Sequence, residues 1–135
     1  MRLYLDSSAL VKRYKLESKS EAVREAMANS DLWLVCRTAF LETGRALAVG
    51  CGPDSSELGC FLAEWRSFTV VEVDQPLVEA ALELAIEHGL RSLDSLQLAG
   101  AALGGHDTVC ATFDRRLWNA AAALGLTTLP QQSPA

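Results

Sequence analysis

Five short apolar runs recur along the chain, separated by longer segments with helical periodicity. The runs are rich in Leu, Val and Thr and show little polar alternation, which is typical of strands buried on both faces. Strands and helices that alternate in this way predict an α/β domain around a parallel sheet. The expected strands are residues 2–6, 32–36, 69–73, 108–112 and 126–129.

The segments between these runs carry recognisable helix starts and stops. Asp74 is expected to cap one helix and Gly89 to end it, while Gly125 ends the last helix. A chain of 135 residues has the length of one domain. We expect that domain over residues 1–129, followed by a flexible tail over 130–135. The expected helices are residues 8–16, 20–28, 39–49, 56–65, 75–88, 92–103 and 114–124.

Composition narrows the class of protein. Hydrophobic residues make up 50% and charged residues 21% of the chain, which excludes a disordered protein. No apolar run reaches the roughly 18 residues needed to span a bilayer. A carboxylate at Asp6 interrupts any secretory signal, so we expect a cytoplasmic protein. The net charge of −5 argues against binding nucleic acid by bulk electrostatics, but it permits a nuclease whose positive charge resides in a metal ion.

Two aspartates follow predicted strands. Asp6 closes the first apolar run, and Asp114 follows the fourth run after Thr112 and Phe113. Open α/β sheets form their sites beyond the carboxyl ends of strands, so both aspartates are candidate site residues. Each is also a good N-cap for the helix that follows it. The two interpretations are compatible, because a capping side chain can also reach a ligand.

A third acid lies within a predicted helix. Glu42 shares its face with Ala39, Ala46 and Val49, which are small and apolar. If this face points inward, the carboxylate needs a partner, because burying a lone charge is costly. Arg45 on a neighbouring stripe is one candidate partner. A simple solvated face is the alternative.

Asp94 lies in the first turn of the helix expected over 92–103, where the helix dipole alone would favour an acid. First turns of helices and carboxyl ends of strands share one edge of a parallel sheet. Four carboxylates at that edge would repel one another unless hard cations bind them. Two such ions about 4 Å apart are a known device for phosphodiester cleavage. The acids therefore predict a Mg²⁺ or Mn²⁺ site.

Hydroxyl and basic side chains surround these acids in the sequence. Ser7, Ser8 and Thr112 are expected to orient the carboxylates, with ordinary capping as the alternative. An aspartyl-phosphate phosphatase with Asp6 as nucleophile is disfavoured, because Ser8 occupies the place of its second acid. Basic residues near the site supply local positive charge or form a solubilising face: Lys12, Arg13, Lys15, Arg115 and Arg116.

Three segments each centre on one of the aspartates: residues 3–12, 88–99 and 111–117. They resemble the opening, the third acidic motif and the fourth acidic motif of PIN-domain proteins, in particular the VapC-type toxins of bacterial toxin–antitoxin pairs. Glu42 falls where that family has its second acid, and the resemblance covers residues 1 to about 129. Gln97 is a departure, since many relatives have His there.

The resemblance implies a single PIN-like domain with a five-stranded parallel sheet in the order 3-2-1-4-5 and about seven helices. It implies that Asp6, Glu42, Asp94 and Asp114 bind one or two Mg²⁺ or Mn²⁺ ions, supported by Ser8 and Thr112. It also implies an endoribonuclease that cleaves structured RNA, a transfer RNA or a ribosomal RNA loop, through a metal-activated water.

The resemblance further implies a homodimer and a small VapB-type antitoxin that binds DNA in place of this chain. No membrane partner is expected. Two alternatives stay open from the sequence: a housekeeping PIN RNA nuclease without a toxin role, and a catalytically inactive PIN binding module. The presence of all four acids argues against the inactive module.

Overall fold

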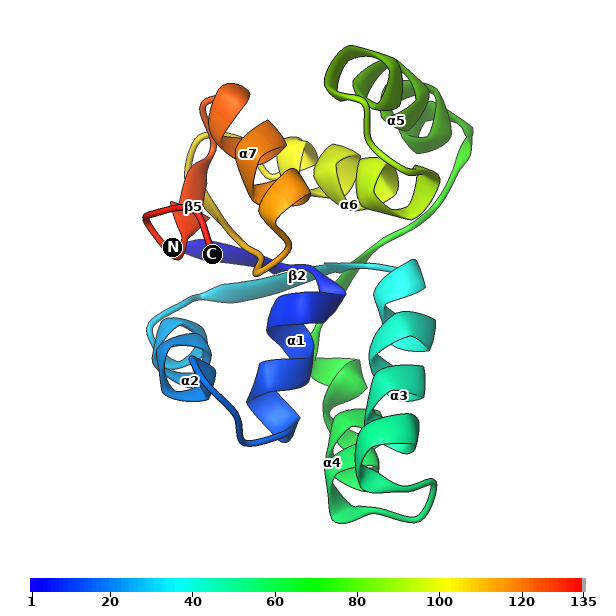
Figure 1. The fold of residues 1–135 in the computed structure, drawn as a ribbon, viewed down its shortest axis with the longest axis vertical. Coiled ribbons are helices and arrows are strands. Elements are labelled where there is room, and N and C mark those ends of the chain that lie inside the picture. Colours follow the sequence, from blue (N-terminus) through cyan, green and yellow to red (C-terminus); the bar gives the residue numbers. More distant parts are fainter. Residues whose placement is uncertain (135) are drawn as a thin grey trace.

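A parallel sheet forms the centre of the molecule in the computed structural model, which describes residues 1–134 (Figure 1). Its five strands lie in the order β3-β2-β1-β4-β5, and every neighbouring pair is parallel. This confirms the predicted sheet and its strand order. The strands are β1 (Arg2–Leu5), β2 (Leu32–Cys36), β3 (Thr69–Val71), β4 (Thr108–Ala111) and β5 (Thr127–Leu129).

Seven α-helices and one 3₁₀ helix connect the strands within residues 1–134. Helix α5 shows why several bounds were predictable: Asp74 accepts a hydrogen bond from the Leu77 N–H at 3.0 Å, and Gly89 ends the helix with a φ of 64°. The helices are α1 (Ser7–Tyr14), α2 (Ser20–Ala28), α3 (Thr38–Cys51), α4 (Ser56–Glu64), η1 (Trp65–Ser67), α5 (Gln75–His88), α6 (Ser92–Leu103) and α7 (Arg115–Ala123).

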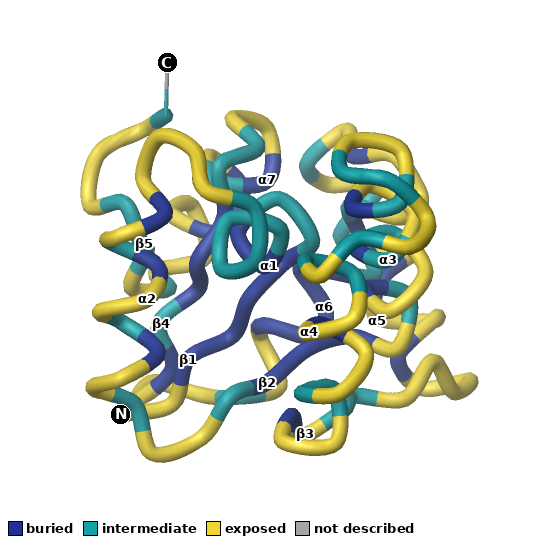
Figure 2. Tube along the Cα trace, turned by 90° about the horizontal axis from the view of Figure 1, so that it is seen from below, coloured by how far each residue is buried: buried dark blue, intermediate teal, exposed yellow. Residues whose placement is uncertain are grey.

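Both faces of the sheet are covered by helices. Successive strand residues point to opposite faces, and in β1 the side chain of Tyr4 packs into the core formed with α5, α6 and α7. Leu3 and Leu5 pack into a second core formed with α1, α2, α3 and α4. The two layers lie above and below the sheet in Figure 1, and the central strands are buried in Figure 2. Burial on both faces explains why the strands lack polar alternation.

Some element ends differ from the predicted bounds. Strand β1 ends at Leu5 because Asp6 is already the N-cap of α1. Helix α1 ends at Tyr14 rather than at residue 16, since Lys15 adopts an extended backbone. Helix α3 is longer than predicted at both ends, and β3 stops at Val71 rather than at residue 73. These ends are set by local backbone geometry that periodicity does not resolve.

The strand order places a topological switch point between β1 and β4. The last residue pair of the two strands is Leu5 with Ala111, and the Asp6 N–H extends the ladder by donating to the Ala111 carbonyl at 3.2 Å. Ligand sites in open α/β sheets form in the crevice at this point. Asp6 and Asp114 follow the two strands that border the crevice.

The end of the chain folds back on α7. The indole Nε1 of Trp118 donates to the Pro130 carbonyl at 2.8 Å, which fixes the start of the segment predicted as a flexible tail. Ala135, its last residue, lies outside the described residues, and the tail as a whole stays a prediction. None of the helices in residues 1–134 is both long and apolar enough to cross a membrane.

Candidate active site

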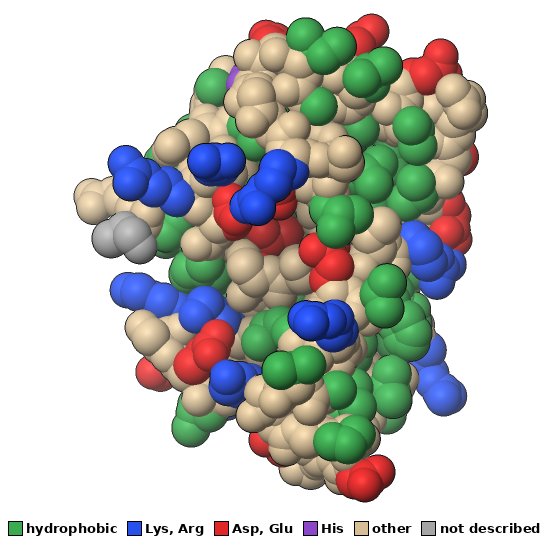
Figure 3. All heavy atoms as spheres, turned by 45° about the vertical axis from the view of Figure 1, so that its right-hand side comes forward, with side chains coloured by type: hydrophobic (Ala, Val, Ile, Leu, Met, Phe, Trp, Pro, Cys, Tyr) green, Lys and Arg blue, Asp and Glu red, His purple; other side chains and the backbone are tan. Residues whose placement is uncertain are grey.

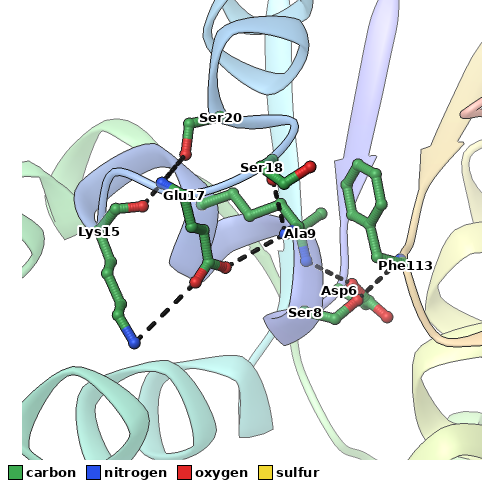
Figure 4. A network of polar contacts seen from close by, with 9 residues as sticks. Asp6, Ser8, Ala9, Lys15, Glu17, Ser18, Ser20 and Phe113 are labelled. Carbon is green, nitrogen blue, oxygen red and sulfur yellow. Dashed lines mark hydrogen bonds and ion pairs between the residues drawn. The ribbon is translucent and has the colours of Figure 1, made fainter. Parts of the chain in front are cut away.

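Asp6 is the most deeply buried of the four predicted acids, with 3% of its surface exposed. Its Oδ1 accepts hydrogen bonds from the Ser8 hydroxyl at 2.7 Å and the Ala9 N–H at 2.9 Å (Figure 4). Its Oδ2 accepts from the Thr112 hydroxyl at 2.5 Å. The pKa of Asp6 is raised from 3.8 to about 6, chiefly by burial. The three hydrogen-bond donors lower this pKa, and the nearby charge of Asp114 raises it further.

Two hydroxyls join the ends of β1 and β4. Thr112 Oγ1 donates to Asp6 and accepts from the Asp114 N–H at 3.1 Å. Ser8 Oγ also donates to Asp6 and accepts from the Phe113 N–H at 2.9 Å. The sequence predicted Ser8 and Thr112 as orienting groups, and these contacts show them holding Asp6. Both strand ends are thereby locked in one geometry.

Asp114 serves as the N-cap of α7. Its Oδ1 accepts from the Leu117 N–H at 3.0 Å, as the capping interpretation predicted. Asp6 likewise caps α1 through Ala9. Capping does not remove either acid from the site, because the charge of Asp114 raises the pKa of both Asp6 and Asp94. Asp6 and Asp94 therefore each lie close enough to Asp114 to feel its charge.

Asp94 completes this group from the first turn of α6. Burial raises its pKa, with a further rise caused by Asp114, whereas Arg91 and Arg116 act in the opposite direction. Its side chain is 22% exposed, and the Arg91 Nε lies 3.7 Å from its Oδ2. Asp94 is thus held less firmly than Asp6.

Glu42 reaches the site from α3, but not in the way the sequence suggested. Its face is buried at one end only: Ala39 is buried, Glu42 itself is half-buried, and Ala46 and Val49 are exposed. The inward-looking face considered for Glu42 is therefore found only in the first turn of α3. Its described hydrogen-bond partners are also not the expected one, Arg45. They are the Gln97 Nε2 at 3.0 Å and, more weakly, the Ser7 hydroxyl at 3.4 Å.

Gln97 is the residue that sequence reasoning undervalued. It is 2% exposed, and its Oε1 accepts from the buried Tyr4 hydroxyl at 2.6 Å. Because this oxygen faces Tyr4, the amide nitrogen faces Glu42. Burial raises the pKa of Tyr4 well above its ordinary value, so the phenol stays a proton donor. A signal existed in the sequence, since Gln97 lies one helical turn after Asp94 on the buried face of α6.

The donor chemistry of the site fits a hard divalent cation. Carboxylate and hydroxyl oxygens are the ligands that Mg²⁺ and Mn²⁺ prefer, and a cation would offset the charge that Asp114 exerts on Asp6 and Asp94. Within residues 1–134, no three His, Cys, Asp or Glu side chains are grouped closely enough to hold a metal ion. Figure 3 shows acidic side chains in a hollow on one face of the molecule, with Lys and Arg side chains around it.

Most of the basic residues of α1 are already paired. Lys12 Nζ lies 3.2 Å from Glu17 and donates to the Ser18 carbonyl at 2.8 Å, while Lys15 Nζ lies 3.9 Å from Glu17 (Figure 4). Arg13 forms a two-point ion pair with Glu64 at 2.6 and 2.9 Å. The interpretation of these residues as free positive charge beside the site is therefore too simple.

Comparison with known proteins places this geometry in a family. The model of the PIN domain family matches residues 3–123. Ribonuclease VapC45 from Mycobacterium tuberculosis is 33% identical over 138 residues, covering 96% of this chain and 96% of the relative. Ribonuclease VapC35 from the same species is 31% identical over 129 residues, covering 92% of this chain and 93% of the relative.

Solved structures show the same fold. The crystal structure of Mycobacterium tuberculosis VapC20, described as a sarcin–ricin loop cleaving toxin, superposes with a TM-score of 0.74 at 18% identity over 98% of this chain and 99% of that one. PAE2754 from Pyrobaculum aerophilum gives a TM-score of 0.67 at 23% identity, over 96% and 90% of the two chains. The resemblance seen in the sequence is confirmed: this chain belongs to the PIN domain family, with VapC ribonucleases among its relatives.

Proposed function

We propose that this chain is a divalent-metal-dependent endoribonuclease. One observation supports the proposal: Asp6 is desolvated and fixed by three donors at the switch point of the sheet, and the charge of Asp114 reaches both Asp6 and Asp94. An arrangement that places repelling carboxylates together is costly without a cation. The curated relatives named as ribonucleases support RNA as the substrate class.

Four acidic side chains are the candidate metal ligands. Asp6, Asp94, Asp114 and Glu42 would hold one or two Mg²⁺ or Mn²⁺ ions. When bound, such ions supply Lewis-acid stabilisation for phosphodiester hydrolysis. In the overall reaction water adds to phosphorus and one P–O bond breaks, which leaves a phosphate monoester and a hydroxyl.

The chain's own contribution is orientation. Ser8 and Thr112 donate to both oxygens of Asp6, which fixes the carboxylate plane before any ligand arrives. Gln97 directs one oxygen of Glu42. Asp94, with only a long contact to Arg91 at 3.7 Å in the described residues, is free to adjust to its ligand. A fixed Asp6 and a movable Asp94 suit a site that must also admit a bulky RNA.

We further propose that the chain is the toxin of a VapBC-type pair, forms a homodimer and acts in the cytoplasm. A toxin–antitoxin complex from Klebsiella pneumoniae shares the fold, with a TM-score of 0.66 at 14% identity over 83% of this chain and 86% of that one. VapC20, described as a sarcin–ricin loop cleaving toxin, supports a structured RNA loop as the target class, beside transfer RNA.

Cleavage by purified protein tests the nuclease proposal. Transfer RNA and a ribosomal RNA-loop oligonucleotide are incubated with Mn²⁺, with Mg²⁺ or with EDTA, and RNA ends are mapped. We expect discrete cuts that require the metal and disappear in Asp6→Asn. Cleavage that persists in EDTA, or that is unchanged in folded Asp6→Asn, contradicts the proposal.

Growth measurements test the toxin role separately. Expression of the chain alone should arrest bacterial growth, and co-expression of the small gene beside it should relieve the arrest. Harmless expression at verified high level in the native host, together with RNA cleavage in vitro, would remove the toxin role and leave a housekeeping nuclease.

A further inference from the structure

A polar cavity lies beside the acid site, and no step of the proposed function uses it. Its volume is about 290 Å³, close to the lower limit of roughly 300 Å³ for small-molecule sites. We name it the α5–α7 cavity, after the helices between which it opens. Its lining residues are His88, Gly89, Leu90, Arg116, Asn119 and Ala120.

Among the described residues, two side chains in the walls of the α5–α7 cavity, Arg116 and His88, have polar groups without a protein partner, while the Asn119 Oδ1 accepts only a long contact from the Ser133 hydroxyl at 3.5 Å. Arg116 forms no ion pair with any carboxylate in residues 1–134. The Nε2 of His88 is shielded from solvent and has no hydrogen-bond partner in the same part of the chain. At Gly89, a Cβ would meet no atom within 4 Å, so the backbone there is open to an incoming group.

The cavity and the acid site share their elements. Arg116 follows the acid Asp114 by two residues in the first turn of α7. Gly89 and Leu90 lead into α6, whose first turn carries Asp94. A chain that crosses the acids can therefore place an adjoining group in the cavity.

We infer that the α5–α7 cavity binds a backbone phosphate of the RNA next to the one that is cleaved, with Arg116 as its charged partner and Asn119 as a neutral one. The guanidinium is the side chain best suited to a phosphate. This inference rests on the proposed ribonuclease function and adds the side from which the RNA approaches.

The chain offers a matched control for this subsite. Arg115 and Arg116 are adjacent, both exposed, and both near the start of α7, yet only Arg116 lines the cavity. Arg115→Gln and Arg116→Gln change the net charge equally. A difference between the two variants therefore reports contact rather than the overall field of the protein.

The first test measures binding of a fluorescein-labelled single-stranded RNA by anisotropy, in EDTA and at several salt concentrations. We expect Arg116→Gln to weaken binding about tenfold and to lower the salt slope by about 0.7, the value for one phosphate contact on a single strand. Arg115→Gln should stay within about twofold of wild type. Equal effects of the two variants would overturn the inference.

The second test uses initial rates with Mn²⁺. Loss of a uniform binding contact raises KM and leaves kcat nearly unchanged, so Arg116→Gln should show this split. A lower kcat at unchanged KM, together with an altered stabilisation by Mn²⁺ alone, would mean that Arg116 acts only through Asp94 and would overturn the subsite.

Two further arms separate RNA from a free ligand. Inorganic phosphate and a 5′-nucleotide are titrated while the Gly89 amide is followed by NMR. Displacement of both by the RNA supports the subsite, whereas binding of the nucleotide without displacement by RNA overturns it. A wild-type protein that binds RNA through Arg116 but never cleaves it would contradict the proposed nuclease function and leave the subsite standing.

Discussion

The two flanks of the acid site are built differently. On the β1 side, Asp6 is 3% exposed and accepts three hydrogen bonds of 2.9 Å or less. On the α6 side, the Asp94 side chain is 22% exposed and Arg91 approaches it only to 3.7 Å. Burial and satisfied hydrogen bonds fix a carboxylate, while partial exposure lets it move. We therefore propose that the β1 flank is the rigid anchor of the site and that the α6 flank adjusts to a bound ligand.

The basic residues also differ between the two sides of the sheet, here helix α1 on one side and helix α7 on the other. Lys12 and Arg13 on α1 are held by carboxylates and stack on aromatic rings, Lys12 over Phe113 and Arg13 over Trp33. Arg116 on α7 has no such partner among residues 1–134. The charges of the α1 flank stabilise the fold, and those of the α7 flank remain available to a substrate.

The largest effect is expected from removing the anchor. Even an outer partner of a metal ligand is worth about 10- to 100-fold in activity, so Asp6→Asn should lower metal-dependent RNA cleavage by more than that. The Asp94→Asn substitution should cost less activity, because the α6 flank is less rigid. Initial cleavage rates of both folded variants check the order, and a larger loss for Asp94→Asn would reverse the assignment of anchor and adjuster.

The anchor also predicts a pH-dependent cost in the metal-free protein. The pKa of Asp6 rises from 3.8 to about 6 on folding, so folded protein holds this proton more tightly than unfolded protein. The loss of folding stability is absent below the unfolded-state pKa of 3.8 and grows as pH rises towards the folded-state pKa of about 6. Above that pH it is complete, on the order of 3 kcal/mol.

Denaturant melts of wild type and Asp6→Asn across this pH window isolate the effect. The difference in unfolding free energy should shift in favour of Asp6→Asn as pH rises, because Asn never ionises. Mn²⁺ should stabilise wild type at the upper end of the window and leave Asp6→Asn nearly unchanged. A difference that stays constant with pH would show that ionised Asp6 carries no desolvation cost.

A smaller effect is expected at Gln97, which links the rigid core to Glu42. Gln97→Leu removes the donor to Glu42 and should lower cleavage about tenfold, chiefly through a higher Mn²⁺ concentration at half-maximal rate. Tyr4→Phe removes the hydrogen bond that orients the Gln97 amide but keeps the amide. It should therefore raise the Mn²⁺ concentration at half-maximal rate by a smaller amount. Loss of stability with an unchanged Mn²⁺ requirement would make Gln97 a packing residue only.

The sequence was informative where caps and strand ends determine geometry. Asp74 and Gly89 fixed the bounds of α5, and the positions of Asp6 and Asp114 after apolar runs placed both at the correct edge of the sheet. The strand order came from the family resemblance, since periodicity contains no information on which strands are neighbours.

Long-range side-chain contacts lay beyond sequence reasoning. The Tyr4–Gln97 bond joins residues 93 positions apart, and neither residue signals the other. The burial of the Glu42 face could not be predicted, because its apolar neighbours Ala39 and Ala46 end up buried and exposed respectively, while Leu47 packs inward from an adjacent face of α3. Ion pairs such as Arg13 with Glu64 likewise depend on how α1 and α4 meet.

The smallest effect is expected on the α1 flank. Arg13→Gln breaks the pair with Glu64 and should lower stability by about 1 kcal/mol, as for other partly exposed pairs. RNA affinity should stay within about twofold of wild type, because this charge is already neutralised. Thermal melts and RNA anisotropy check both halves, and a loss of affinity as large as that of Arg116→Gln would erase the difference between the flanks.

The most direct test of the account compares the two ends of one strand. Asp107 and Asp114 flank β4 at its amino and carboxyl ends, roughly 23 Å apart for seven extended residues. Asparagine retains capping ability at both positions, and both substitutions change the net charge equally. Metal-dependent RNA cleavage should fall sharply in Asp114→Asn and stay within a few-fold of wild type in Asp107→Asn. Equal activity of the two folded variants, or a large loss at Asp107 alone, would contradict a catalytic site at the carboxyl edge of the sheet.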